Sequence, residues 1–343
     1  MREIGSEFWL EREPAALFHD RDGCYVLSGR TAIDLIIQDI AKTRLVRSVY
    51  MPAWGCDSMI APFLAQGTQI ELYDISFDGR LVYHIDNTCS TDVFYVTNYF
   101  GYENTLDIDV VRQFKAQGAI ILYDRTHSFL MDNDPCLELA DYSFASIRKW
   151  MGVIGGAVVN GVKDCKLKPC SYLDCKELAM RMKKAFIEDD DSIDKQTFLN
   201  LYGEFGHHLV EDYQNYEMDD LSYALYKTED FAAMRHKRRN NAKYLHEHLK
   251  GVRLIGELTD NSAPLFVPVF FETTEQRNAV RKKLIDAQIY CPIHWPKPAQ
   301  IPADFAVNKI YDTELSLICD QRYNLTDMER FVTQIAQITQ INE

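Results

Sequence analysis

The sequence has no apolar run close to the ~20 residues that a helix needs to cross a bilayer. Its first ten residues carry charge where a signal peptide would be apolar. Basic residues are also in the minority, because 37 Lys and Arg stand against 51 Asp and Glu, for a formal net charge of −14. Nucleic acids and anionic membranes attract cationic surfaces, so neither is expected as a partner.

Several motifs are absent as well. The nine cysteines are an odd number in a chain of 343 residues, so we expect a reducing cytoplasm and no secreted disulfide framework. Cys165, Cys170 and Cys175 recur every five residues but lack the close pairs of zinc sites, and no metal site is expected. There is no Walker loop, no Gly-x-Gly-x-x-Gly fingerprint and no hydrolase nucleophile elbow.

Residues 30 to 160 alternate between helical and strand-like patterns. Apolar residues recur at helical spacing in 31–43 and 107–117. Short strand-like runs occupy 48–51, 70–73, 92–97 and 119–123. Strands separated by helices predict βαβ units and a mostly parallel sheet, hence an α/β fold. Ligands of such sheets bind beyond the carboxyl ends of the strands, where Asp124 follows its run directly.

The rest of the chain predicts further helices and a second domain. Residues 172–228 look mainly helical, with charge around apolar stripes. Strand-like and helical runs then follow at 265–271, 273–287, 315–319 and 326–338. A content of 47% hydrophobic residues suffices for two cores. We expect a large α/β domain over residues 1–230 and a small C-terminal α+β domain over 231–343.

Lys149 is the candidate catalytic residue. It lies between a β-rich run and the pair Gly155-Gly156, and the run 119–123 upstream leads to Asp124 and then His127. Pyridoxal phosphate (PLP) chemistry needs a lysine for a Schiff base and an acid that holds the pyridinium nitrogen. Together these residues predict a PLP enzyme. The alternatives are a surface lysine, a capping aspartate and a loop histidine.

Two further segments are candidates for holding that cofactor. Residues 27–31, Leu-Ser-Gly-Arg-Thr, place a glycine turn before a helix N-terminus, which is typical of an anion site, although ordinary capping has the same pattern. Ser143 and Ser146 are competing further phosphate contacts. Trp54 follows a strand and offers an aromatic face to a pyridine ring, with the hydrophobic core as the alternative.

With these pieces in order, the chain resembles the DegT/DnrJ/EryC1/StrS family of PLP-dependent aminotransferases, which belongs to fold type I, the aspartate aminotransferase superfamily. The segments similar to family motifs are Ser28–Ala32, Met51–Trp54, Asn98–Gly101, Asp124–His127, Ser143–Lys149 with Gly155-Gly156, Leu315–Leu317 and Asn324–Glu329. They span most of the chain.

The resemblance implies a role for each motif. Lys149 would form the Schiff base and then shuttle a proton, and Asp124 would hold the pyridinium. The phosphate would be held by Gly29, Arg30, Thr31 and Ser143 or Ser146, and His127 would contact the phenolic oxygen of the ring. The resemblance also implies a homodimer with active sites at the subunit interface.

Some positions depart from the family pattern. The usual ring-stacking position holds Cys56, so Trp54 or another residue must stack. The usual serine position holds Phe144, and no Asn-x-Arg loop follows the glycine pair. His294 and Arg322 lie in segments that fold type I enzymes use near the substrate, and Arg322 is a candidate for pairing a donor carboxylate.

The predicted function is an aminotransferase that moves an amino group from an amino acid donor to a keto group, with a nucleotide-linked sugar as one candidate acceptor. Because fold does not fix reaction, two alternatives stay open. One is another PLP reaction on the same fold, a dehydratase or a lyase. The other is a catalytically weak PLP-fold protein that acts as a sensor or structural partner.

Overall fold

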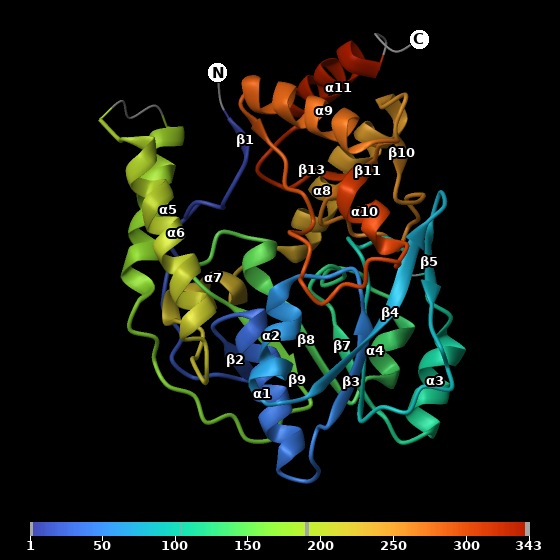
Figure 1. The fold of residues 1–343 in the computed structure, drawn as a ribbon. Coiled ribbons are helices and arrows are strands. Elements are labelled where there is room, and N and C mark those ends of the chain that lie inside the picture. Colours follow the sequence, from blue (N-terminus) through green and yellow to red (C-terminus); the bar gives the residue numbers. More distant parts are fainter. Residues whose placement is uncertain (1–2, 104, 189–191, 340–343) are drawn as a thin grey trace.

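A large sheet forms the centre of the molecule in the computed structural model, which describes residues 3–103, 105–188 and 192–339 (Figure 1). Its strand order is β2-β9-β8-β7-β6-β3-β4-β5. In that order the strands are Cys24–Val26, Ala157–Asn160, Tyr142–Ser146, Ile120–Asp124, Val93–Thr97, Ser48–Pro52, Gln69–Phe77 and Leu81–His84. The five strands from β8 to β4 run parallel, and β2, β9 and β5 pair antiparallel at the sides. The mostly parallel α/β sheet predicted from the sequence is confirmed.

Helices cover both faces of this sheet because successive side chains of a buried strand point to opposite sides. Leu122 of β7 packs in one cluster with α1 (Gly29–Ala41) and α2 (Asp57–Ala65). Its neighbours on β7 pack in another cluster with α3 (Ile108–Ala116), beside which α4 (Pro135–Leu139) lies. The carboxyl ends of β6, β7 and β8 border a cavity.

The C-terminal part is a smaller α+β unit with its own core (Figure 1, top). A three-stranded antiparallel sheet, in the order β10-β11-β13, consists of Arg253–Leu254, Val267–Phe270 and Glu314–Leu317. The other elements are α8 (Phe231–His248), α9 (Thr274–Asp286), β12 (Ile289–Tyr290), α10 (Val307–Thr313) and α11 (Leu325–Thr339). The N-terminal strand β1 (Ile4–Gly5) pairs in parallel with β12, so the first residues also contact this unit. A domain boundary near residue 230 stays a prediction.

The predicted helical region contains α5 (Leu173–Ile187), α6 (Lys195–Glu211) and α7 (Asp220–Lys227). The pair α5 and α6 stands at one side of the molecule, next to the N-terminal segment (Figure 1). Two buried lysines of α5 hold that segment: Lys176 forms an ion pair with Glu7 at 3.0 Å, and Lys183 donates to the Glu7 carbonyl oxygen at 2.6 Å. Within the described ranges, none of the helices has the length and apolar character needed to cross a membrane.

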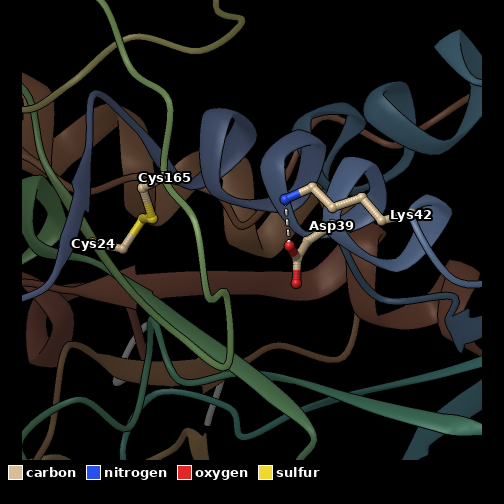
Figure 2. The surroundings of a disulfide bond; sticks show 4 residues. All are labelled: Cys24, Asp39, Lys42 and Cys165. Carbon is tan, nitrogen blue, oxygen red and sulfur yellow. Dashed lines mark hydrogen bonds and ion pairs between the residues drawn. A yellow bond between two sulfur atoms is a disulfide. The ribbon is translucent and has the colours of Figure 1, made fainter.

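A disulfide joins Cys24 of β2 to Cys165, which lies just beyond β9 (Figure 2). The two strands are neighbours, with Cys24 opposite Val159 in the ladder. The odd number of cysteines predicts no secreted disulfide framework, and this link between residues 141 positions apart is a finding that spacing alone does not show. Near it, Lys42 pairs with Asp39 on α1 at 2.8 Å (Figure 2). The cytoplasmic location stays a prediction.

Candidate active site

Two cavities meet at Lys149. The first has a volume of about 360 Å³ and lies at the carboxyl ends of β7 and β8, where Asp124 and Ser146 end their strands. The second has a volume of about 460 Å³ and extends between the N-terminal segment, α6 and the small C-terminal unit. Four residues line both cavities: His127, Arg148, Lys149 and Trp295. The lysine that the sequence singled out is therefore accessible from either cavity.

Lys149 ends a short 3₁₀ turn, Ile147–Lys149, directly after β8. Its side chain is accessible to solvent within the cavities, although protein surrounds it. That burial lowers the pKa of the lysine, and the positive charge of neighbouring Arg148 lowers it further, while Glu7 acts in the opposite direction. A lowered pKa favours the neutral amine, the nucleophilic form.

The glycine pair after Lys149 has a packing explanation. A Cβ on Gly155 would lie 2.9 Å from the Leu27 carbonyl oxygen, and one on Gly156 would lie 2.4 Å from the Met218 side chain. The chain at this point passes too close to β2 and its neighbours for any side chain. The glycines thus bring the start of β9 against the residue that precedes Ser28.

Asp124 is a buried carboxylate at the wall of the first cavity, with 6% of its surface exposed. The Tyr95 hydroxyl donates to its Oδ2 and the Thr126 N–H donates to its Oδ1, both at 2.8 Å. Burial raises its pKa, and no basic side chain of the described residues forms an ion pair with it. A buried anion without a cation is costly, and a protonated pyridine nitrogen would supply that cation.

The N-terminus of α1 opens into the first cavity. Ser28 caps the helix, accepting from the Thr31 N–H at 3.2 Å and bonding the Thr31 hydroxyl at 2.9 Å. Thr31 is fully buried and does not line the cavity, whereas Gly29 and Arg30 do. Arg30 also donates to the Leu209 carbonyl oxygen at 2.9 Å. Thr31 therefore fits the capping alternative. The backbone N–H groups of Gly29 and Arg30 remain the candidates for binding an anion.

Of the two candidate serines, Ser146 lines the first cavity and Ser143 does not. Ser143 lies at the buried start of β8, where its hydroxyl accepts from Asn160 at 3.2 Å. Ser146 ends the strand, and a Cβ built on Gly29 would lie 3.5 Å from the Ser146 Cβ. The strand position separates the two serines, because ligands reach only the carboxyl end.

The aromatic candidate does not reach the cavity. Trp54 is fully buried, its indole N–H donates to the His294 carbonyl oxygen at 2.8 Å, and its ring stacks on Tyr99 at 4.6 Å. It lines neither cavity and packs in the core, so a contact between Trp54 and a cofactor ring stays a prediction. Cys56 does line the first cavity, at the N-cap position of α2.

His127 lies where the two cavities meet and is 7% exposed. The Phe100 N–H donates to its Nδ1 at 3.3 Å, and its ring stacks on Trp295 at 5.5 Å. Burial, and secondarily the charge of Lys149, lowers the pKa of His127 to about 3, so the imidazole is neutral. Trp295 provides an aromatic wall. It belongs to the segment 291–295, which the resemblance places near the substrate, but no spacing signal puts it beside Lys149. Arg148 was missed, although its adjacency to Lys149 was a usable signal.

The second cavity contains both predicted substrate residues. His294 and Arg322 line it. Arg322, however, donates two hydrogen bonds to Asp320, at 2.9 and 2.8 Å, and its guanidinium lies 3.9 Å from the Phe8 ring. Because Asp320 already accepts hydrogen bonds from two N–H groups of Arg322, the guanidinium is not free to form a bidentate pair with the carboxylate of an amino donor.

No family model matches the sequence, and no curated protein matches it. Among solved structures, the aminotransferase PseC of Helicobacter pylori, involved in the biosynthesis of pseudoaminic acid, is similar with a TM-score of 0.70 and 14% identity over 99% of this chain and 100% of that chain. NtdA of Bacillus subtilis, with bound cofactor PMP, is similar with a TM-score of 0.64 and 16% identity, over 94% of this chain and 74% of that one. DesI, solved in the presence of its TDP-sugar product, is similar with the same TM-score of 0.64 and 16% identity, over 93% and 81%.

Two features of the molecule agree with these likenesses. The eight-stranded, mostly parallel sheet and the antiparallel sheet of the C-terminal unit both fall within the shared part. The chain therefore has the fold of these proteins, fold type I of the PLP-dependent aminotransferases.

Proposed function

We propose that this protein is a PLP-dependent aminotransferase with Lys149 as its cofactor-binding lysine. The observation that carries the proposal is the pairing of Lys149 and Asp124 in one cavity at the strand ends. One supplies an amine with a lowered pKa, and the other a buried carboxylate without a cationic partner. These are the two groups that the cofactor requires from a protein.

The described residues fit PLP in a second respect. The cofactor carries a phosphate, and the first cavity offers the α1 N-terminus at Gly29 with Ser146 beside it. A side chain at position 29 would fill the space between that turn and β8, in contact with Phe144 at 3.4 Å. The absence of a Cβ leaves backbone N–H groups able to approach an anion. When bound, PLP supplies the electron sink for reactions at the α-carbon of an amino acid.

The chain's own residues have the following roles in this proposal. Asp124, fixed by Tyr95 and Thr126, holds a proton on the ring nitrogen. Lys149, in its neutral form, moves a proton to and from the substrate carbon. His127 is neutral and lines the same cavity as Asp124 and Lys149, so it would hydrogen-bond the phenolic oxygen of the cofactor ring. Trp295 and the apolar residues of the second cavity exclude water from the reacting groups.

The amino donor is an amino acid and the acceptor a keto compound. The second cavity, of about 460 Å³, is large enough for such small molecules. We propose a nucleotide-linked sugar as the acceptor, supported by the likeness to DesI with its TDP-sugar product. We also propose a homodimer, with the active sites at the interface, and a cytoplasmic location.

The test is a comparison of Lys149→Ala with Lys282→Ala, an exposed control lysine of α9 that lines neither cavity. Both variants are mixed with PLP and then with a panel of amino acids. We expect Lys282→Ala to bind the cofactor covalently and release a keto acid, and Lys149→Ala to do neither. Transamination by Lys149→Ala would contradict the proposal. Ammonia or thiol release, with the cofactor unchanged, would indicate a dehydratase or lyase, and bound cofactor without any donor reaction would indicate the sensor role.

A further inference from the structure

Strand β13 presents a polar face inside a buried region. Glu314 and Ser316 are two residues apart and so lie on the same side of the strand, and neither has exposed surface. Leu315 and Leu317 point to the other side, into the core of the C-terminal unit. Buried polar side chains are costly unless they are hydrogen-bonded, so the partners of this pair matter.

Their partner is His294, in the wall of the second cavity. The backbone N–H of His294 donates to Glu314 Oε2 at 2.7 Å, and the ring Nδ1 of His294 lies 2.8 Å from the Ser316 Oγ. The Ser316 hydroxyl in turn lies 2.5 Å from Glu314 Oε1. A continuous chain of hydrogen bonds thus runs from the buried carboxyl to a ring at the cavity. In the described part of the chain, no group bonds the other ring nitrogen, Nε2.

Among the described residues, no basic side chain forms an ion pair with the carboxyl, although the charge of Arg277 acts on it. Arg277 of α9 donates to the backbone oxygen of Glu314 at 3.1 Å rather than to its side chain, and its positive charge opposes the effect of burial on the pKa of Glu314. Cys291, which also feels the charge of Arg281, is a further titratable group nearby. Burial raises the pKa of Glu314 to about 8. On the cavity side, burial and then the neighbours His127 and Lys149 hold the pKa of His294 far below its ordinary value. His294 is therefore neutral, while burial places the pKa of Glu314 at about 8.

The hydrogen-bond chain has two arrangements that differ by one proton. With Glu314 ionised, Ser316 donates to Glu314 and the Nδ1–H of His294 donates to Ser316, which leaves a lone pair on Nε2. With Glu314 protonated, Glu314 donates to Ser316 and Ser316 donates to Nδ1, so that Nε2 carries the proton. The charge on Glu314 thereby sets the tautomer of His294.

We propose that Glu314 and Ser316 are positioning residues that make His294 a proton acceptor and donor at the second cavity. A bound ammonium group, which must lose a proton before its nitrogen can attack, gives that proton to Nε2. The proton on Nδ1 passes to Ser316, and the Ser316 hydroxyl proton passes to Glu314. One proton enters, the carboxylate becomes neutral, and no charged imidazolium remains. The inference rests on the proposed aminotransferase function, in which an amino donor supplies the ammonium group.

The experiment observes the tautomer directly. The full-length protein, labelled with ¹⁵N-histidine, is titrated without cofactor from about pH 6 to pH 10, and the ring nitrogens are followed by NMR. His294→Gln assigns the signals. We expect the His294 proton to move from Nε2 to Nδ1 with a midpoint near pH 8, the pKa of Glu314. In Glu314→Gln, whose amide mimics the protonated acid, Nε2–H should persist at every pH.

Two controls show whether the effect is specific. Glu272→Gln, at an exposed position beyond β11, should leave the titration unchanged. His246, bonded to Tyr102 on another face of the molecule, should give the same signals in all proteins. A single His294 tautomer across the range in the unsubstituted protein, or a switch that survives Glu314→Gln, would overturn the proposal.

A kinetic arm separates this inference from the proposed function. If the function holds, the donor reaction of Glu314→Gln should fall at least about tenfold and lose its dependence on the Glu314 pKa. If Lys149 binds no cofactor while the tautomer switch is present, the function fails and the switch stands. If transamination occurs without the switch, the function stands and the relay fails.

Discussion

Glu314→Gln should make the free energy of unfolding less sensitive to pH. The pKa of Glu314 is raised to about 8 from 4.5 because its carboxyl is fully buried. Between those values the folded protein holds a proton that the unfolded chain has lost. Stability from this group is therefore present at low pH and is lost as pH rises through the folded pKa. Glutamine is neutral throughout and has no such loss.

The size of the effect follows from proton linkage. When the pH rises from about 6 to about 8.5, the free energy of unfolding of the unsubstituted protein should fall by about 2.5 kcal/mol more than that of Glu314→Gln. Urea unfolding, followed by tryptophan fluorescence at the two pH values, measures the difference through the midpoint at constant slope. Glu272→Gln, an exposed substitution, should behave like the unsubstituted protein. Parallel losses in all three proteins would refute the assigned burial and protonation of Glu314.

Two further changes have defined outcomes. Asp124→Asn removes the buried anion but keeps the shape of the side chain. PLP should then bind at least about tenfold more weakly in equilibrium dialysis, because a buried charge-assisted hydrogen bond is worth roughly 1.5–3 kcal/mol. Unchanged affinity would exclude Asp124 as the partner of the ring nitrogen. Cys24→Ser should lower the melting temperature. A disulfide between residues 141 positions apart lowers the conformational entropy of the unfolded chain, which stabilises the folded protein by up to about 5 kcal/mol. A melting curve insensitive both to this substitution and to dithiothreitol would mean that the bond contributes nothing in solution.

The fold could be predicted from local patterns because they are strong where the sheet is parallel. A strand buried on both faces, such as β6, is a continuous apolar run, and such runs separated by helices have few alternatives. The same reasoning predicted that Asp124 lies at the carboxyl end of its strand, whereas Lys149 was singled out by its own segment. Both line the cavity at the strand ends.

The finer assignments depended on contacts between distant segments. Trp54 looked like a ring partner from its local sequence, but its N–H is taken by His294, 240 residues away. Arg322 looked free, yet Asp320 occupies its guanidinium. Trp295 and the Cys24–Cys165 bond likewise depend on which segments the fold brings side by side. Periodicity and spacing carry no information about such pairs.

The most direct test of the central claim is the absorbance spectrum of the purified protein with added PLP, before and after borohydride reduction, followed by peptide mapping. If Lys149 holds the cofactor, a visible band disappears on reduction and the cofactor is fixed on the peptide that contains Lys149. No band, or a modification on another lysine such as the cavity residue Lys195, would contradict the central claim.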